Sequence, residues 1–307
     1  MSDGQNAKRP AKQGAKQGGR GGKPGAKRGG APRFRGIYRE DGRKTILYLL
    51  GSTRSGTSAL RNAIYQTRYN GYGEGHMEPL LSHIVEEVRA FAGTKTRGNA
   101  RDRLEADALL EHLFRGYEEY LSEQQISDYL MDKTPSSRII AAAPMLNRYH
   151  GDAKFIFCAR RHVDNVQSKI KKFSGKDFTT HCQAWASANR AWERVRDQLD
   201  GNYLAFDFHD LAVDPAGIAA RIAAYLELPP EEETLMAEYL VSERPQSESA
   251  TRDLTKYLKL SELDWTDEQR EIFQRICGPL GESMGYGYER YFRHQEEADA
   301  ATETGQG

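Results

Sequence analysis

Two kinds of hydrophobic pattern alternate along the middle of the chain. Residues 45–50 (TILYLL) and 154–159 (KFIFCA) are nearly continuous apolar runs, the pattern of strands that are covered on both faces. Residues 203–206 form a third, shorter run. Apolar residues also recur at the three- and four-residue spacing of amphipathic helices, over residues 58–66, 80–91, 104–121, 164–173, 180–199, 215–226 and 267–284.

This alternation of strands and helices predicts the fold class. Right-handed βαβ units place successive strands in parallel, so we expect an α/β domain of three layers with a central parallel β-sheet flanked by helices. A chain of 307 residues with 38% hydrophobic residues is sufficient for one substantial core. We find no internal repeat and no pattern that indicates a second domain.

The two ends of the chain differ in composition from its middle. Residues 1–44 contain thirteen Lys and Arg against three acidic residues, and Phe34 is the first aromatic residue. We therefore expect a disordered basic tail over residues 1–42, a folded domain over 43–293 and a disordered acidic tail over 294–307. The basic tail could bind a polyanion such as nucleic acid or an anionic membrane surface, or it could be a solvated segment with no dedicated partner.

Hydropathy and cysteine usage suggest a cellular location. No run approaches the about 20 apolar residues that span a bilayer, and the first residues lack the apolar core of a secretory signal. Cys158, Cys182 and Cys277 have no metal-like spacing and are expected to be buried thiols of a reducing compartment. These features predict a soluble cytoplasmic protein with no transmembrane segment.

A segment of small residues joins the first predicted strand to the first helix. It reads Gly51-Ser52-Thr53-Arg54-Ser55-Gly56-Thr57-Ser58. Such residues let backbone N–H groups surround an anion, and the helix N-terminus adds the positive end of its dipole. The glycine spacing resembles the Walker A pattern, but Thr57 occupies the place of its Lys, and the cation is Arg54 within the loop. We interpret the segment as a phosphate or sulfate site; the alternative is a tight turn without a ligand.

A second candidate anion site follows the strand at residues 154–159. This strand ends in Arg160 and Arg161, where a nucleotide triphosphatase often has an Asp for magnesium. Arginines suit phosphate and do not bind metal, and Ser168 lies eight residues after Arg160 on the following helix. The two sites together indicate a ligand with phosphates at two separated points and no magnesium. The alternative for the arginine pair is a surface ion-pair cluster.

These segments resemble the family of sulfotransferases that use 3′-phosphoadenosine-5′-phosphosulfate (PAPS). The resemblance covers about residues 43–290 and rests on five stretches in the correct order: residues 51–61, 132–135 (DKTP), 154–168, 206–229 and 249–286. It implies a P-loop-like domain, PAPS as co-substrate and no metal. It also implies the donor-binding residues, namely Ser52, Thr53, Arg54, Ser55, Gly56, Thr57 and Ser58 for the 5′-phosphosulfate, and Arg160, Ser168 and Arg252 for the 3′-phosphate.

The resemblance also suggests which residues act on the acceptor. Arg54 would stabilise the charge that develops on the leaving phosphate. Members of the Golgi type that use a glutamate base carry it in a Gly-Glu-Glu sequence, of which Glu74 matches the first glutamate. His76 is the second candidate for the base and Glu78 the third, while Lys133 of the DKTP stretch is expected near the active site. The alternative for each residue of this loop is a solvated side chain.

The sequence is compatible with several classes of acceptor. A carbohydrate, a lipid-linked sugar, a small molecule or a peptide tyrosine would each supply a suitable hydroxyl, and a small molecule could also supply an amine. Two other functions compete with sulfuryl transfer. One is a P-loop nucleotide kinase or NTPase, which the absent Walker lysine disfavours, and the other is a non-catalytic polyanion-binding protein that uses the basic tail.

Overall fold

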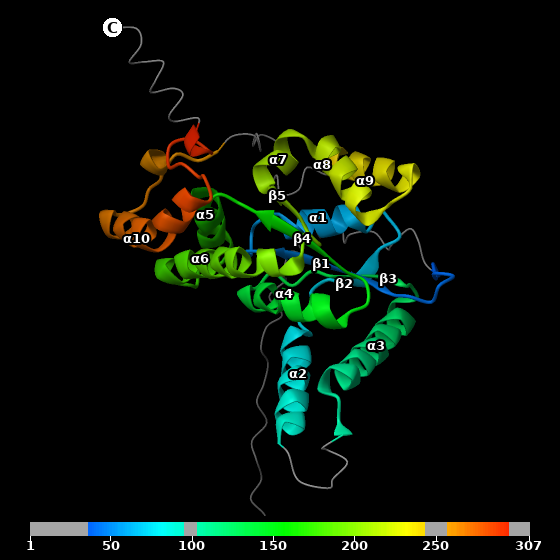
Figure 1. Cartoon of the computed structure of the whole chain (residues 1–307). Helices are drawn as coiled ribbons and strands as arrows, with labels where there is room; N and C mark the ends of the chain where they lie inside the picture. Colours follow the sequence, from blue (N-terminus) through cyan, green and yellow to red (C-terminus); the bar gives the residue numbers. More distant parts are fainter. Residues whose placement is uncertain (1–35, 95–102, 243–256, 295–307) are drawn as a thin grey trace, which may run out of the picture. The chain divides into compact units, whose positions relative to one another are not determined.

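A five-stranded parallel β-sheet forms the centre of the protein. The computed structural model describes residues 36–94, 103–242 and 257–294. Its strands are β1 (Thr45–Gly51), β2 (Asn70–Tyr72), β3 (Tyr129–Asp132), β4 (Ala153–Ala159) and β5 (Leu204–Asp207). They are arranged in the order β2-β3-β1-β4-β5, and every neighbouring pair is parallel (Figure 1). The predicted fold class, an α/β domain with a central parallel sheet, is confirmed.

Helices follow the strands and cover both faces of the sheet (Figure 1). They are α1 (Thr57–Ile64), α2 (Glu78–Gly93), α3 (Ala106–Gln125), α4 (Ser137–Tyr149), α5 (His162–Lys172), α6 (Phe178–Val195), α7 (Phe208–Val213), α8 (Pro215–Leu226), α9 (Pro230–Ser242) and α10 (Asp267–Ser283), with 3-10 turns at Arg196–Leu199 and Leu260–Glu262. The predicted helix over residues 215–226 has the observed bounds of α8. Its start is well marked, because the Asp214 side chain caps the helix and Pro215 occupies its first turn.

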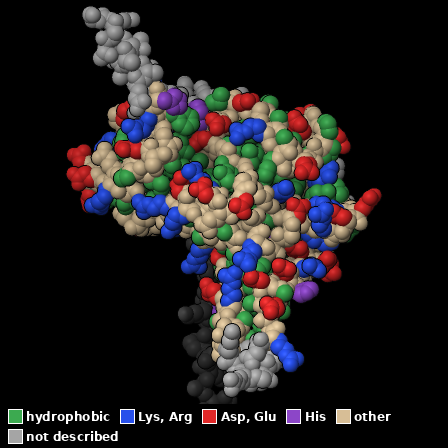
Figure 2. All heavy atoms as spheres, viewed as in Figure 1, with side chains coloured by type: hydrophobic (Ala, Val, Ile, Leu, Met, Phe, Trp, Pro, Cys, Tyr) green, Lys and Arg blue, Asp and Glu red, His purple; other side chains and the backbone are tan. Residues whose placement is uncertain are grey.

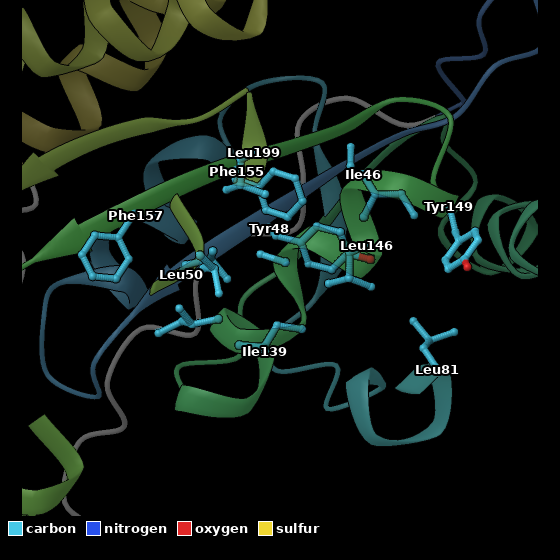
Figure 3. Close-up of a cluster of buried hydrophobic side chains, with 14 of the residues drawn as sticks. Ile46, Tyr48, Leu50, Leu81, Ile139, Leu146, Tyr149, Phe155, Phe157 and Leu199 are labelled. Atoms are coloured by element: carbon cyan, nitrogen blue, oxygen red, sulfur yellow. The ribbon is translucent and has the colours of Figure 1, made fainter. Parts of the chain in front are cut away.

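The alternating side chains of β1 divide the core into two layers. Ile46, Tyr48 and Leu50 face α2, α3, α4 and α6 (Figure 3). Leu47 and Leu49 point to the opposite face, where α1, α7, α8 and α9 pack. All seven residues of the strand are buried, which explains why its sequence is a continuous apolar run.

A third apolar cluster lies beside the sheet and joins α5, α6 and α10. Trp185 of α6 and Phe273 of α10 are fully buried in it together with Val163 of α5. The cluster holds the C-terminal part of the described chain against the helix that follows β4. Cys182 and Cys277 are buried here and Cys158 is buried in β4, and all three are free thiols, as predicted.

The hydrophobic pattern did not predict several of the observed strands and helices. The sequence indicated neither β2 nor β3, because a strand of three or four residues is too short to show a period. Helix α4 was not predicted either, and it contains a proline, Pro144. Residue Ile37 forms a parallel bridge to Ser127, so the expected tail over residues 1–42 includes a segment that contacts the domain.

The described surface carries both signs of charge. Acidic and basic side chains are interspersed over the face shown in Figure 2. Among the helices of residues 36–94, 103–242 and 257–294, none combines the length and the apolar character that crossing a membrane requires.

Candidate functional site

The phosphate loop, residues 52–56, lies where the chain direction across the sheet changes. Helix α1 follows β1 onto one face, whereas α4 follows the neighbouring strand β3 onto the other. Ligands of open α/β sheets bind at such a switch point, beyond the carboxyl ends of the strands. The loops after β1 and β3 also touch, since the Thr53 hydroxyl donates to the Pro135 carbonyl at 3.3 Å.

The backbone of the phosphate loop is held in unusual conformations. Arg54 has φ 72° and Gly56 has φ 89°, both in the left-handed region. A side chain at Gly56 would also collide with the Phe208 ring, since its Cβ would lie 2.3 Å from that ring. Gly56 is the N-cap of α1, so the positive end of this helix lies at the loop. The loop therefore has the form of an anion-binding turn between a buried strand and a helix.

Side chains from β4 and α5 hold the loop from outside. The Asn165 amide donates to the Thr53 carbonyl at 3.1 Å and to Ser55 Oγ at 3.0 Å. Lys169 Nζ donates to Ser52 Oγ at 2.8 Å, and the Cys158 thiol donates to the Ser55 carbonyl at 2.8 Å. Four hydrogen bonds thus hold backbone and side-chain polar groups of the loop in the structure.

The structure brings the two predicted anion elements together. Arg160 donates from Nη1 to the Arg54 carbonyl at 2.8 Å. Arg54 in turn donates from Nε to Ser168 Oγ at 3.1 Å. The Arg160 guanidinium also lies over the Phe208 ring, 4.6 Å from its centroid. The loop after β1, the residue after β4 and helix α5 are therefore joined by consecutive hydrogen bonds, although Arg54 and Arg160 are 106 residues apart in the sequence.

Arg161 has a different role from the one its sequence suggested. It is fully buried and forms an ion pair with Asp164 at 2.7 Å. It also donates to the backbone carbonyls of Leu258, Gly287 and Arg290. Arg161 thus ties the C-terminal segment to α5, whereas its neighbour Arg160 contacts the phosphate loop. Arg252 lies outside the described residues.

The Glu74 loop, residues 73–77, lies beside the end of β3. Lys133 Nζ donates to Glu74 Oε1 at 2.5 Å, and His76 Nε2 lies 3.1 Å from Glu74 Oε2. The Lys133 side chain is 5% exposed, whereas those of Glu74 and His76 are 45% and 62% exposed. Burial opposes ionisation of Glu74, but Lys133 and His76 outweigh it and hold the pKa of Glu74 below its usual value.

A polar network supports the backbone of the Glu74 loop. The His76 N–H donates to Thr134 Oγ1 at 3.1 Å, and the Thr134 hydroxyl donates to Asp132 at 2.7 Å. His76 has φ 50°, and a Cβ at Gly75 would lie 2.4 Å from an Asp132 oxygen. Burial raises the pKa of Asp132, although hydrogen bonds from Thr134 and Gly75 act in the opposite direction. A larger residue at position 75 would therefore require the Asp132 carboxylate to move.

Glu78 and Ser58 lie apart from these contacts. Glu78 begins α2, is buried, and accepts a hydrogen bond from Ser82 at 2.9 Å. Ser58 is exposed on the first turn of α1. Of the three candidates for the base, the structure therefore joins Glu74 to both His76 and Lys133 and gives Glu78 a partner within its own helix.

A pocket of about 330 Å³, including its open mouth, lies next to the Glu74 loop. Three tyrosines line it, Tyr48, Tyr72 and Tyr117, together with Gly75 and Asp132. Tyr72 is partly exposed at 42%. The pocket thus offers aromatic walls and a carboxyl group close to the residues that the sequence assigned to the acceptor.

Sequence reasoning missed Asn165 and Lys169, although both contact the phosphate loop. A signal was present, because both fall on the buried face of α5 with Val163 and Val166. A polar side chain within an apolar stripe needs a buried partner, and here the partner is the loop. Within the described ranges, no three His, Cys, Asp or Glu residues gather as metal ligands would.

Several solved structures are similar to this chain. The sulfotransferase domain of the Synechococcus PCC 7002 olefin synthase is 19% identical, with 85% of this chain and 99% of that chain covered and a TM-score of 0.48. Sulfotransferase STF9 from Mycobacterium avium is 16% identical, with coverages of 78% and 76% and a TM-score of 0.49. Mouse sulfotransferase SULT7A1, solved in complex with PAP, is 13% identical, with coverages of 80% and 89% and a TM-score of 0.44.

The family model of the sulfotransferase family matches residues 47–232. This range includes the phosphate loop, the Glu74 loop, Lys133 and the element from Arg160 to Ser168. No curated protein matches the chain.

Proposed function

Because this chain belongs to the sulfotransferase family and hence to the enzymes of sulfuryl transfer, we propose that its donor is PAPS. We further propose that its acceptor is a hydroxyl or amine of a carbohydrate, a lipid-linked molecule or a small molecule. The observation that carries the donor assignment is the meeting of Arg54, Arg160 and Ser168 beside the phosphate loop. A donor with phosphates at both its 3′ and 5′ positions matches this pair of adjoining anion sites.

The phosphate loop would bind the 5′-phosphosulfate of the donor. Its backbone and the side chains of Ser52, Thr53 and Ser55 precede the N-terminus of α1, whose first turn carries Thr57 and Ser58. Arg160 and Ser168 would hold the 3′-phosphate, with Arg252 as a further contact. Because Asn165 and Lys169 fix the loop in advance, little reorganisation would accompany binding.

Two groups would carry the chemical step. Glu74 would accept the proton of the attacking hydroxyl or amine, while Arg54 would donate hydrogen bonds to the phosphate oxygen that leaves the sulfur. The bond from the acceptor atom to sulfur then forms as the sulfur–oxygen bond to the 5′-phosphate breaks. Lys133 keeps Glu74 ionised, so the base would be available at neutral pH.

The pocket beside the Glu74 loop would receive the part of the acceptor next to the reacting group. Of its lining, Tyr72 and Tyr117 would stack against the apolar C–H face of a sugar ring or against an aromatic group. For the basic segment of residues 1–35, which lies outside the described residues, we propose contact with a polyanion or an anionic membrane surface.

A transfer assay with labelled PAPS and a panel of acceptors tests the proposed function. We expect label to move to at least one carbohydrate, lipid-linked or small-molecule acceptor, and to do so with a chelator present. The Glu74→Gln variant should bind adenosine 3′,5′-bisphosphate but transfer little label. Binding of ATP with magnesium, without binding of the bisphosphate, would instead favour a nucleotide kinase or NTPase. Removal of residues 1–35 should leave transfer intact, and its loss would show that the basic segment is needed for the reaction.

A further inference from the structure

Lys169 is a buried lysine that contacts the phosphate loop. It lies on α5 directly after Ser168, is 2% exposed, and donates from Nζ to Ser52 Oγ at 2.8 Å. No carboxylate of the described chain forms an ion pair with it. A buried ammonium group normally has an opposite charge beside it, because desolvation of an unpaired ion is costly.

None of the titratable groups around Lys169 supplies that opposite charge. Helix α6 contributes His181 and Cys182, helix α10 contributes Cys277, and Lys176 follows α5. Burial raises the pKa of Cys277 and keeps its thiol uncharged. Burial, followed by repulsion from Lys169, lowers the pKa of His181. The surroundings are therefore neutral or positive, and burial lowers the pKa of Lys169 itself to about 7.

The phosphate loop is the place where a negative charge would arrive. In the Walker A pattern a lysine of the loop itself meets the phosphates, but here Thr57 stands at that position. Lys169 brings an ammonium group to the same loop from the helix that carries Ser168. Ser52, which accepts its hydrogen bond, is the residue that follows β1 and is itself 2% exposed.

We propose that Lys169 is a positioning residue of the donor site, which holds Ser52 in place and takes up a proton when the anionic donor binds. The donor is the counter-ion that Lys169 lacks in the free protein. This inference rests on the proposed function only for the identity of the anion, because any sulfate or phosphate in the loop would favour the charged lysine.

The sign of the pH dependence follows from linkage. The complex holds more protons than the free protein, so affinity for the donor must fall as pH rises above about 7. Other groups of the site do not interfere in this range. Arg54 and Arg160 stay protonated, Glu74 stays ionised, and phosphate groups with a second pKa near 6 are mostly ionised at pH 7 and fully ionised above pH 8.

Titrations of adenosine 3′,5′-bisphosphate between pH 7 and 9 test the proposal. We expect the affinity of the wild-type protein to fall roughly tenfold or more over this range. The Lys169→Met variant should bind less tightly at pH 7 and show a flat profile. Lys172→Met, which removes an exposed lysine of the same helix, should retain the wild-type profile. A lysine that only supported the fold would leave the pH profile unchanged when replaced.

Calorimetry of the wild-type protein in two buffers of different ionisation enthalpy provides a measurement that needs no variant. Close to one proton should be taken up per bisphosphate bound at pH 8, and no uptake would overturn the proposal. Ser52→Ala, which keeps the cation but removes its partner, should weaken binding and retain the pH dependence.

Inorganic sulfate, which does not titrate in this range, separates the role of Lys169 from the identity of the donor. Binding of the bisphosphate with identical profiles for wild type and Lys169→Met would overturn the proposal and leave the donor assignment intact. Lys169-dependent binding of sulfate without binding of the bisphosphate would support the proposal and contradict the donor assignment. Lys169-independent binding of both anions, or binding of neither, would overturn the proposal.

Discussion

The phosphate loop and the Glu74 loop lie next to each other but are built in different ways. The phosphate loop is fixed by side chains from two other elements, among them Asn165 and Lys169, and most of its residues are buried. The Glu74 loop is held from one side, by Lys133 and Thr134, and the Glu74 and His76 side chains extend into solvent. The first loop is therefore held from several sides, whereas the side chains of the second are largely exposed.

This difference corresponds to the two substrates of the proposed reaction. A donor that is the same in every cycle favours a preorganised site, because fixed donors need no reorganisation at the moment of reaction. An acceptor that differs between enzymes is more easily accommodated by an exposed loop on a rigid scaffold. Substitutions in the Glu74 loop should then change the transfer rate without changing donor affinity. Substitutions around Arg160 should change donor affinity with little effect on the transfer rate.

The largest effect is expected for Glu74→Gln. Loss of a general base costs roughly 10²–10⁴ in rate, while donor affinity should stay the same because Glu74 does not touch the phosphate loop. His76→Asn should be milder. Initial rates at saturating PAPS and titrations with adenosine 3′,5′-bisphosphate measure both quantities, with Glu87→Gln on the exposed side of α2 as control. Near-normal turnover of Glu74→Gln together with a collapse in His76→Asn would assign the base to the histidine.

Arg54→Ala should lower turnover by about 10²–10³, because a donor aimed at the leaving oxygen acts mainly in the transition state. Its loss of donor affinity should be smaller. Arg54→Gly is the matched control for the backbone, since Arg54 has φ 72° and glycine relieves any strain there. The two variants should lose turnover to the same extent. If Arg54→Ala and Arg54→Gly each lost donor affinity and transfer rate to the same extent, Arg54 would contribute only to binding of the donor and not to stabilisation of the transition state.

Arg160→Ala should weaken binding of adenosine 3′,5′-bisphosphate at least roughly tenfold, the cost of a lost charged hydrogen bond. Turnover at saturating donor should fall much less. Arg194→Ala removes an exposed arginine of α6 and controls for net charge. A thermal-shift titration that gives the same affinity for wild type and Arg160→Ala would remove Arg160 from the donor site.

The smallest effect is expected for Lys133→Met, and it concerns pH. Lys133 helps to hold the pKa of Glu74 below its usual value. Its removal makes ionisation of Glu74 less favourable, so the acid limb of the rate profile should move to higher pH. Lys171→Met, on the exposed end of α5, should leave this limb unchanged. An acid limb that does not move in Lys133→Met would separate Glu74 from the proton transfer.

Local patterns determined much of this protein. A parallel α/β sheet could be predicted from the apolar runs of β1 and β4 and from the amphipathic helices between them. Strands that are buried on both faces and helices that are buried on one face differ in the spacing of their hydrophobic residues. The segment from Gly51 to Ser58 and the spacing of Arg160 and Ser168 also predicted anion sites. These signals lie within short stretches of sequence, so the residue types and their spacing are sufficient to recognise them.

The tertiary structure decided the features that depend on distant partners. Arg160 and Arg161 are adjacent in sequence, yet the first contacts the phosphate loop and the second is buried against the C-terminal segment. Lys133 meets Glu74, and Lys169 meets Ser52, across separations of 59 and 117 residues. No local pattern encodes these pairs, because they depend on which strands are neighbours in the sheet and on which face of α5 is turned inward. The order β2-β3-β1-β4-β5 therefore determined which charged residues surround the candidate site.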